Sequence, residues 1–184
     1  MQELLPQAYL IGLIVLLGAA AVVVGRQILR VRRDEHALAR LGGNAGRGGD
    51  RPGDSSGLYE LASVQLRKRL YSQATDTLKL ALKRAEAEQA PAEARALIEN
   101  ALGFALAAQN KYPVAVRHYR AALRAKADYP VALNNLAFAL EKQQKPEEAE
   151  ELYRQALVLD PDNRTASKRL KRLERRQGQD DRAA

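Results

Sequence analysis

The chain has 184 residues, and its 30 Lys and Arg outnumber its 22 Asp and Glu, which gives a formal net charge of +8. It contains no cysteine, which excludes a disulfide framework, a thiolate metal site and a cysteine nucleophile. Its two histidines, His36 and His118, lie 82 positions apart in segments of different character, so His-based zinc sites and Ser-His-Asp chemistry are poorly supported.

Residues 4–25 form an apolar segment that carries no charge and a single side-chain amide, Gln7. As a helix it spans about 33 Å, against a hydrocarbon core of about 30 Å, so we predict a transmembrane helix over 4–25. A cleaved signal peptide is the alternative, because residues 19–21 are three alanines. A signal peptide needs positive charges before its apolar core, whereas here they follow it.

Four arginines follow the apolar segment closely, namely Arg26, Arg30, Arg32 and Arg33. By the positive-inside rule the N-terminus is translocated and the body of the chain stays on the cytoplasmic or stromal side. Residues 26–41 keep a helix-forming composition, and we predict a basic juxtamembrane helix that ends at Gly42. Residues 42–57 contain seven glycines and are predicted to be a flexible linker.

The body of the chain repeats with a period of 34 residues. Ala115, Tyr119 and Ala122 recur as Ala149, Tyr153 and Ala156, and Gly103 recurs as Ala137. This period is that of the tetratricopeptide repeat (TPR), which is a pair of packed helices. Small residues let the two helices approach closely, and the tyrosines fill the space between them. The spacing therefore predicts an all-α solenoid.

Three repeats are predicted, over 55–88, 96–129 and 130–163, which is the minimum for a stable solenoid. The first lies 41 rather than 34 residues before the second, and we interpret the extra residues 89–95, which include Pro91, as a longer connection. A basic capping helix over 164–176 and a disordered tail over 177–184 are predicted to follow. The cap carries Lys168, Arg169, Lys171, Arg172, Arg175 and Arg176.

The first helix of each repeat is expected to line a groove that binds protein segments. Asparagines there are suited to bonding a ligand backbone and phenylalanines to contacting its apolar side chains, although packing alone also explains both. A clamp for a C-terminal carboxylate is not expected, since Tyr59 and Ser63 stand where that clamp needs a Lys and an Asn. The predicted groove residues are Tyr59, Ser63, Leu66, Asn100, Phe104, Ala107, Asn134, Phe138 and Glu141.

The order of segments carries a more specific resemblance. An apolar segment that ends in Gly-Arg-Gln-Ile-Leu-Arg (25–30) leads to Leu-Tyr-Glu-Leu (58–61), Asn-Ala-Leu-Gly (100–103), Val-Ala-Leu-Asn-Asn-Leu (131–136) and the basic cap. This arrangement resembles the cyanobacterial and plastid family of thylakoid TPR proteins that support photosystem I assembly. The resemblance implies a single-pass thylakoid protein with its N-terminus in the lumen and its TPR domain on the stromal or cytoplasmic face. It also implies protein partners, namely photosystem I subunits or other assembly factors, with no cofactor and no enzymatic activity.

Other functions remain open from the residues alone. A membrane-anchored TPR scaffold for secretion or cell division has the same architecture. Nucleic-acid binding by the tail is disfavoured because the tail has no aromatic residues. Enzymatic activity is disfavoured because the sequence has no clustered acid/base pair and no phosphate-binding loop. The distribution of charge also disfavours nucleic-acid binding by the repeat array. Residues 57–163 carry fifteen basic and fourteen acidic side chains, whereas residues 164–184 carry eight basic and three acidic ones.

Overall fold

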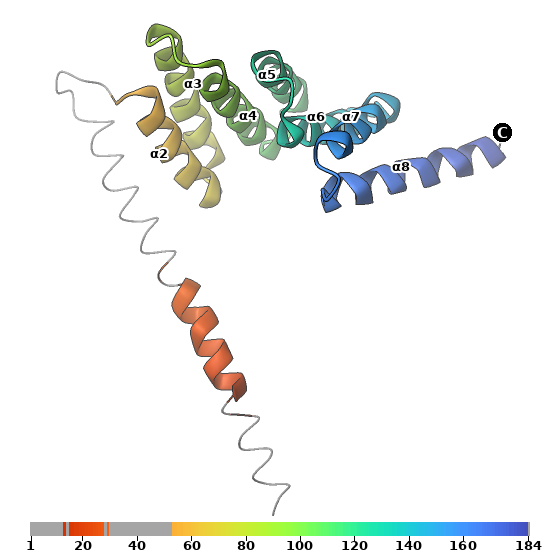
Figure 1. Cartoon of the computed structure of the whole chain (residues 1–184), viewed down its shortest axis with the longest axis horizontal. Helices are drawn as coiled ribbons and strands as arrows, with labels where there is room; N and C mark the ends of the chain where they lie inside the picture. The colour runs from red at the N-terminus through yellow and green to blue at the C-terminus, as the bar shows by residue number, and fades with distance from the viewer. Residues whose placement is uncertain (1–12, 14, 28, 30–52, 184) are drawn as a thin grey trace, which may run out of the picture.

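The computed structural model describes residues 13, 15–27, 29 and 53–183 (Figure 1). Residues 15–27 are helical and their apolar side chains are exposed. Within the described ranges, no helix combines the length and the apolar character that a membrane span requires. The predicted transmembrane helix over 4–25 lies partly outside these residues, and residues 30–52 of the predicted juxtamembrane helix and linker lie wholly outside them.

Residues 53–183 form seven α-helices joined by short turns. The helices pack as three pairs, α2–α3, α4–α5 and α6–α7, and α8 follows and packs on α7. This arrangement confirms the all-α TPR solenoid predicted from the repeat spacing (Figure 1). The helix bounds are α2 Ser55–Arg67, α3 Tyr71–Ala87, α4 Ala92–Ala108, α5 Tyr112–Ala125, α6 Pro130–Lys142, α7 Pro146–Leu159 and α8 Arg164–Ala183.

The first helices of the repeats form the inner row of the array. The helix α2 contacts α4 as well as its own partner α3, and α4 contacts α6 as well as its own partner α5. Such contacts between alternate helices arise on the inner side of a curved stack, which is the side that solenoids use as an extended binding surface. The solvent-facing side of α2, α4 and α6 is called the inner groove below.

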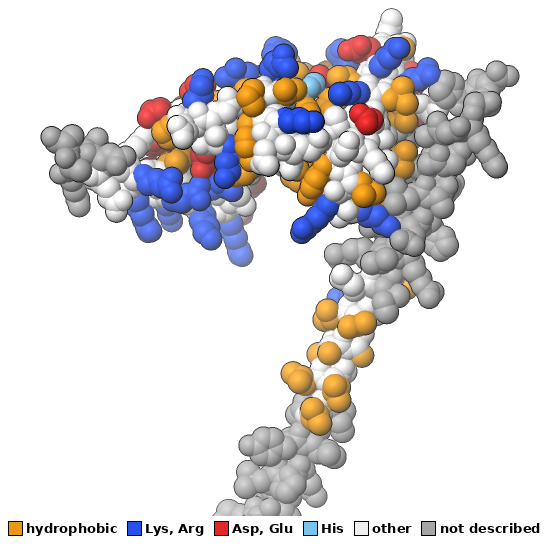
Figure 2. Space-filling view, turned by 180° about the vertical axis from the view of Figure 1, so that it is seen from behind, with side chains coloured by type: hydrophobic (Ala, Val, Ile, Leu, Met, Phe, Trp, Pro, Cys, Tyr) orange, Lys and Arg blue, Asp and Glu red, His pale blue; other side chains and the backbone are white. Residues whose placement is uncertain are grey.

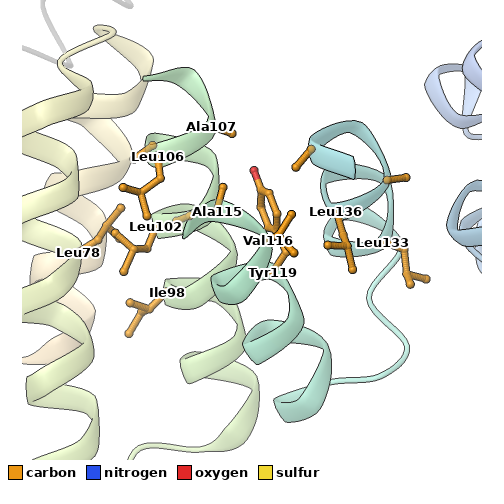
Figure 3. Close-up of a cluster of buried hydrophobic side chains, with 14 of the residues drawn as sticks. Leu78, Ile98, Leu102, Leu106, Ala107, Ala115, Val116, Tyr119, Leu133 and Leu136 are labelled. Carbon is orange, nitrogen blue, oxygen red and sulfur yellow. The ribbon is translucent and has the colours of Figure 1, made fainter. Parts of the chain in front are cut away.

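The core of the second repeat depends on a glycine. A Cβ atom on Gly103 would lie 2.6 Å from Cε1 of Tyr119, whose side chain is buried between the helices. In Figure 3, Leu78 of α3 points toward Leu102 of α4, and Leu136 of α6 lies on the other side of Tyr119. The prediction that a small residue at position 103 lets the two helices approach is therefore confirmed.

Four helices end in the same tight turn. The residue after each helix cap has a positive φ of 51–61°, and none of these residues is glycine. The next backbone N–H donates to a carbonyl five residues earlier, as in Leu70 to Gln65 at 2.9 Å and Lys145 to Leu140 at 3.1 Å. This is the Schellman motif, which reverses the chain in few residues. The residues with positive φ are Arg69, Gln89, Asn110 and Gln144.

The extra residues between the first two repeats lengthen helices instead of forming a longer connection. α3 continues to Ala87 and α4 begins at Ala92, so the connection is only residues 88–91. Both helices are 17 residues long, and their ends are rich in alanine and glutamate, which are strong helix formers. The interpretation of 89–95 as a long loop was wrong because composition favoured helix on both sides of Pro91.

Two further boundaries differ from the sequence prediction. The helix α2 begins at Ser55, inside the predicted linker 42–57, because the Asp54 carboxylate caps it by accepting a bond from the Gly57 N–H at 2.9 Å. At the other end, α8 extends to Ala183 through the residues predicted as a disordered tail. No proline interrupts residues 164–183, and the arginine, glutamine and alanine that they contain are compatible with helix.

Candidate functional site

The inner groove exposes apolar side chains in the second and third repeats. Leu97 and Phe104 lie seven residues apart on α4 and are 41% and 45% exposed, and Val131, which corresponds to Leu97 one repeat later, is 52% exposed. Large apolar side chains that gather on one face of a well-packed protein indicate a contact surface. The sequence analysis missed Leu97 and Val131, although each precedes a predicted groove phenylalanine by two helical turns.

Both groove phenylalanines are held by a tyrosine from the neighbouring second helix. The rings of Phe104 and Tyr71 meet edge to face with their centroids 6.5 Å apart, and those of Phe138 and Tyr112 do so at 6.4 Å. Each tyrosine is the first residue of its helix, α3 or α5. Such pairs add about 0.5–1.5 kcal/mol beyond their area burial and fix the ring orientation. The Phe104 ring is therefore preorganised for contact.

The two predicted groove asparagines have different surroundings. Asn100 Nδ2 donates to the Tyr129 hydroxyl at 3.2 Å, and its Oδ1 accepts from Asn135 Nδ2 at 3.0 Å, so Asn100 connects α4 to α6. Burial raises the pKa of Tyr129, which keeps that hydroxyl protonated. The Oδ1 atom of Asn134 is buried and accepts no hydrogen bond from the residues that the structure describes.

An unpaired buried acceptor costs about 1–3 kcal/mol. Asn134 is therefore the groove asparagine with an unused hydrogen-bonding capacity, whereas both ends of the Asn100 amide already serve the contact between the second and third repeats.

At the third repeat, α8 covers part of the predicted groove. Glu141 accepts from the Tyr153 hydroxyl at 2.6 Å and from Arg169 at 3.2 Å, and it also pairs with Arg172. The guanidinium carbon of Arg169 lies 4.3 Å from the centroid of the Phe138 ring. Burial and the bond to Glu141 raise the pKa of Tyr153. Phe138 and Glu141 are thus engaged with the basic cap.

The remaining predicted groove residues contribute mainly to packing. Tyr59 and Leu66 are half-buried against the core, and Ala107 is buried in it. The Ser63 hydroxyl donates to the Tyr59 carbonyl one turn earlier, at 2.8 Å. The open part of the inner groove therefore consists of Leu97, Phe104 and Val131.

The structure describes the predicted basic residues of α8 and one of the four predicted near the N-terminus. Lys168, Lys171, Arg175 and Arg176 are exposed on α8. Near the N-terminus Arg26 is helical and exposed, whereas Arg30, Arg32 and Arg33 lie outside the described residues.

Away from the groove, the one described histidine is paired inside the second repeat. His118 Nδ1 lies 2.7 Å from Glu99 Oε2, and both side chains are partly buried between α4 and α5. Among the described residues no group of three or more His, Asp or Glu side chains is placed to hold a metal ion.

Comparison with known proteins identifies relatives along nearly the whole chain. Residues 130–163 match the Tetratricopeptide repeat family model. The ycf37 protein of Guillardia theta is 31% identical over 182 residues, which cover 99% of both chains. The ycf37 protein of Cyanophora paradoxa is 37% identical over 114 residues, which cover 62% of this chain and 64% of that protein.

A third relative comes from a land plant. The chloroplastic tetratricopeptide repeat domain-containing protein PYG7 of Arabidopsis thaliana is 30% identical over 169 residues, which cover 92% of this chain and 54% of that protein. The chain therefore spans less than two thirds of the Cyanophora and Arabidopsis relatives and nearly all of the Guillardia one.

A solved structure shows the same fold. The first TPR of Spaghetti (RPAP3), bound to the HSP90 peptide SRMEEVD, matches with a TM-score of 0.62 and 21% identity over 68% of this chain and 94% of that chain. The TPR solenoid is a scaffold that presents its concave surface to protein partners. The chain therefore has the architecture of a protein-interaction adaptor.

Proposed function

The chain belongs to the ycf37 family of TPR proteins, and on that basis we propose that it is a membrane-anchored adaptor that supports photosystem I assembly. The apolar segment over 4–25 serves as the anchor in the thylakoid membrane, with the N-terminus in the lumen. The TPR array lies on the stromal or cytoplasmic face and binds photosystem I subunits or other assembly factors.

Two observations support the proposal, one for the anchored topology and one for the plastid location. The chain contains an uncharged segment of membrane-spanning length that is followed directly by arginines, the order expected when the body of a protein remains on the cytoplasmic side. The Arabidopsis relative carries the word chloroplastic in its name. Anchoring raises the effective concentration of the groove near membrane-embedded clients, so a weak and reversible site is sufficient.

The observation that carries the binding function is the apolar part of the inner groove. Leu97, Phe104 and Val131 are large, exposed and gathered on the first helices α4 and α6. The other large apolar side chains that the array exposes lie on or beside the second helices α3 and α7, namely Leu70, Leu80, Val158 and Leu159. A few aromatic and aliphatic anchors in a preorganised setting provide most of the energy of a typical protein interface. The three side chains on α4 and α6 are therefore the expected client contacts.

The groove is tested by the double variant Leu97→Ala with Phe104→Ala in the full-length chain, expressed in a photosynthetic host that lacks its own copy. We expect loss of client co-purification from detergent-solubilised membranes and a lower ratio of photosystem I to photosystem II. The matched control is Leu80→Ala with Val158→Ala, which removes two exposed apolar side chains from the second helices α3 and α7. Equal photosystem I in both variants contradicts the proposal, and co-purified secretion or division proteins favour a general membrane scaffold instead.

The anchor is tested by deleting residues 1–33. We expect the shortened chain in the soluble fraction after cell breakage, with its TPR array still folded by circular dichroism. Continued membrane attachment that resists a high-salt wash means that the anchor lies elsewhere in the chain.

A further inference from the structure

The helix α8 occupies the place that the first helix of a fourth repeat would take. A shift of 34 residues carries Ala132 onto Ala166 and Ala139 onto Leu173, and all four are buried. α8 packs on α7 as α6 packs on α5. The positions of α8 can therefore be matched to those of α6 one by one.

The same shift carries the inner groove onto a basic surface. Val131, Asn134 and Phe138 of α6 correspond to Thr165, Lys168 and Arg172 of α8. These three residues of α8 line a shallow hollow of about 740 Å³ whose remaining walls are basic side chains of the same helix. In Figure 2, Lys and Arg side chains gather along one side of this end of the molecule. The inner face thus continues from an apolar stretch to a basic one.

Among the described residues, most of this positive charge has no ion-pair partner. Glu141 pairs with Arg169 and Arg172. Within the part of the chain that the structure describes, the other cations of the hollow form no ion pair, and these are Arg164, Lys168, Lys171, Arg175 and Arg176.

Like charges four residues apart destabilise a helix, and α8 contains four such pairs, 164/168, 168/172, 171/175 and 172/176. A capping helix needs only a polar outer face, which mixed charges also provide. A face of one sign that continues a binding groove therefore points to an anionic occupant.

We propose that this occupant is a client segment that carries apolar side chains over α4 and α6 and acidic side chains over α8. The inference rests on the proposed adaptor function, since it specifies the client chemistry of the same groove. Arg172 is already held by Glu141, so part of the surface is ordered before a carboxylate arrives. Carboxylates pair with guanidinium and ammonium groups through charge-assisted hydrogen bonds.

The apolar residues of α8 favour a protein segment over a membrane surface. A helix that lies in a bilayer interface presents an apolar face to the lipid. Leu173 of α8 is buried and Leu170 packs against the core, and no large apolar side chain of α8 is exposed among its described residues. The basic residues moreover lie in register with the groove that exposes Phe104.

The charge contribution is tested with the quadruple variant Lys168→Gln, Lys171→Gln, Arg175→Gln and Arg176→Gln in the full-length chain. We expect about tenfold less client recovered from solubilised membranes at low salt, because each exposed pair contributes modestly and four are lost. The matched control removes the same charge from exposed cations of α3 and α5, namely Lys79→Gln, Lys83→Gln, Arg117→Gln and Arg124→Gln. Equal loss in both variants, or no loss in either, overturns the inference.

The identity of the occupant is tested by placing the photo-crosslinker p-benzoylphenylalanine in place of Lys171 or of Phe104 in the full-length chain in its own membrane. We expect both positions to capture the same client, with the Lys171 adduct mapping to an acidic stretch. If position 104 captures a client while position 171 captures lipid or a non-acidic segment, the inference is overturned. The adaptor function is not contradicted by that result. Absence of any protein adduct at Phe104 contradicts the adaptor function itself.

Discussion

The second and third repeats carry a phenylalanine and a buried tyrosine at matching positions, yet their inner faces are used differently. Phe104 is 45% exposed, whereas Phe138 lies under the Arg169 guanidinium. The position of Glu141, which anchors two arginines of α8, is occupied in the second repeat by Ala107. The matching positions of the second repeat therefore leave Phe104 exposed, whereas Glu141 of the third repeat fastens the cap.

The two repeats also differ in their cores. Tyr119 packs directly against Gly103, and among the described residues its hydroxyl has no hydrogen-bond partner. Tyr153 packs in the third repeat, where Ala137 takes the place of Gly103, and its hydroxyl donates to Glu141. Close packing thus dominates the core of the second repeat, and a polar network joins the core of the third repeat to α8.

The largest effect is expected from Gly103→Val. The new side chain must enter space held by the fully buried Tyr119 ring, and overpacking of this kind costs about 3 kcal/mol of unfolding free energy. Chemical denaturation followed by circular dichroism measures the loss. The control is Gly178→Val on α8, where a Cβ atom meets nothing within 4 Å. Similar denaturation midpoints for the two variants contradict the packing described for the second repeat.

Removing the hydroxyls of the two buried tyrosines should affect the repeats unequally. Tyr153→Phe deletes a hydrogen bond to a carboxylate and should cost about 1.5–2 kcal/mol, because bonds to charged groups are the stronger ones. Tyr119→Phe deletes no such bond and should cost less than about 0.5 kcal/mol. Urea denaturation of both variants gives the comparison, and a larger loss for Tyr119→Phe contradicts it.

Alkaline pH should weaken the fold through the same tyrosines. Burial raises the pKa of Tyr119 and of Tyr153 above the ordinary value of 10.0, with the bond to Glu141 adding to the shift at Tyr153. The unfolded chain therefore loses these protons first, and stability falls as pH rises above about 10, by up to about 1.4 kcal/mol per pH unit for each tyrosine.

Denaturation midpoints measured between about pH 8 and pH 11 test this slope. Tyr153→Phe should have a shallower decline than the unaltered chain, since one of the shifted groups is gone. A decline of unchanged steepness means that Tyr153 does not contribute to the pH dependence.

A smaller effect on stability is expected at the turns that end the first helices of the second and third repeats. Asn110 and Gln144 both have a φ of 60°, a conformation that asparagine tolerates better than glutamine. Gln144→Gly should therefore stabilise the chain by about 0.5–1 kcal/mol, and Asn110→Gly by less. Thermal unfolding of the two variants ranks them, and destabilisation by Gln144→Gly contradicts the assigned turn geometry.

Much of the fold follows from the sequence because the repeat spacing reports helix packing directly. Tyr119 and Tyr153 recur with Gly103 and Ala137 because two close helices need a large residue opposite a small one. The extra residues 89–95 were misinterpreted since spacing alone does not distinguish a longer loop from longer helices, and local alanine and glutamate content decided for helix.

The groove was predictable to a lesser extent. Periodicity places Phe104 and Phe138 on one face, but only the fold shows that Arg169 reaches one of them and not the other. The length and direction of an arginine side chain on the next helix are not part of any repeat pattern. Leu97 and Val131 could have been predicted from the sequence, because each lies two helical turns before a groove phenylalanine and therefore on the same helix face.

In the proposed function Phe104 contacts a client, whereas Phe138 fastens the cap. This difference is tested most directly by comparing Phe104→Ala and Phe138→Ala, each in the full-length chain, for the amount of client that co-purifies from solubilised membranes per folded molecule. We expect Phe104→Ala to lower recovery about tenfold, because a central aromatic anchor is lost. We expect Phe138→Ala to lower the unfolding temperature while client recovery stays within about threefold. Full recovery with Phe104→Ala and loss with Phe138→Ala would contradict the proposed function.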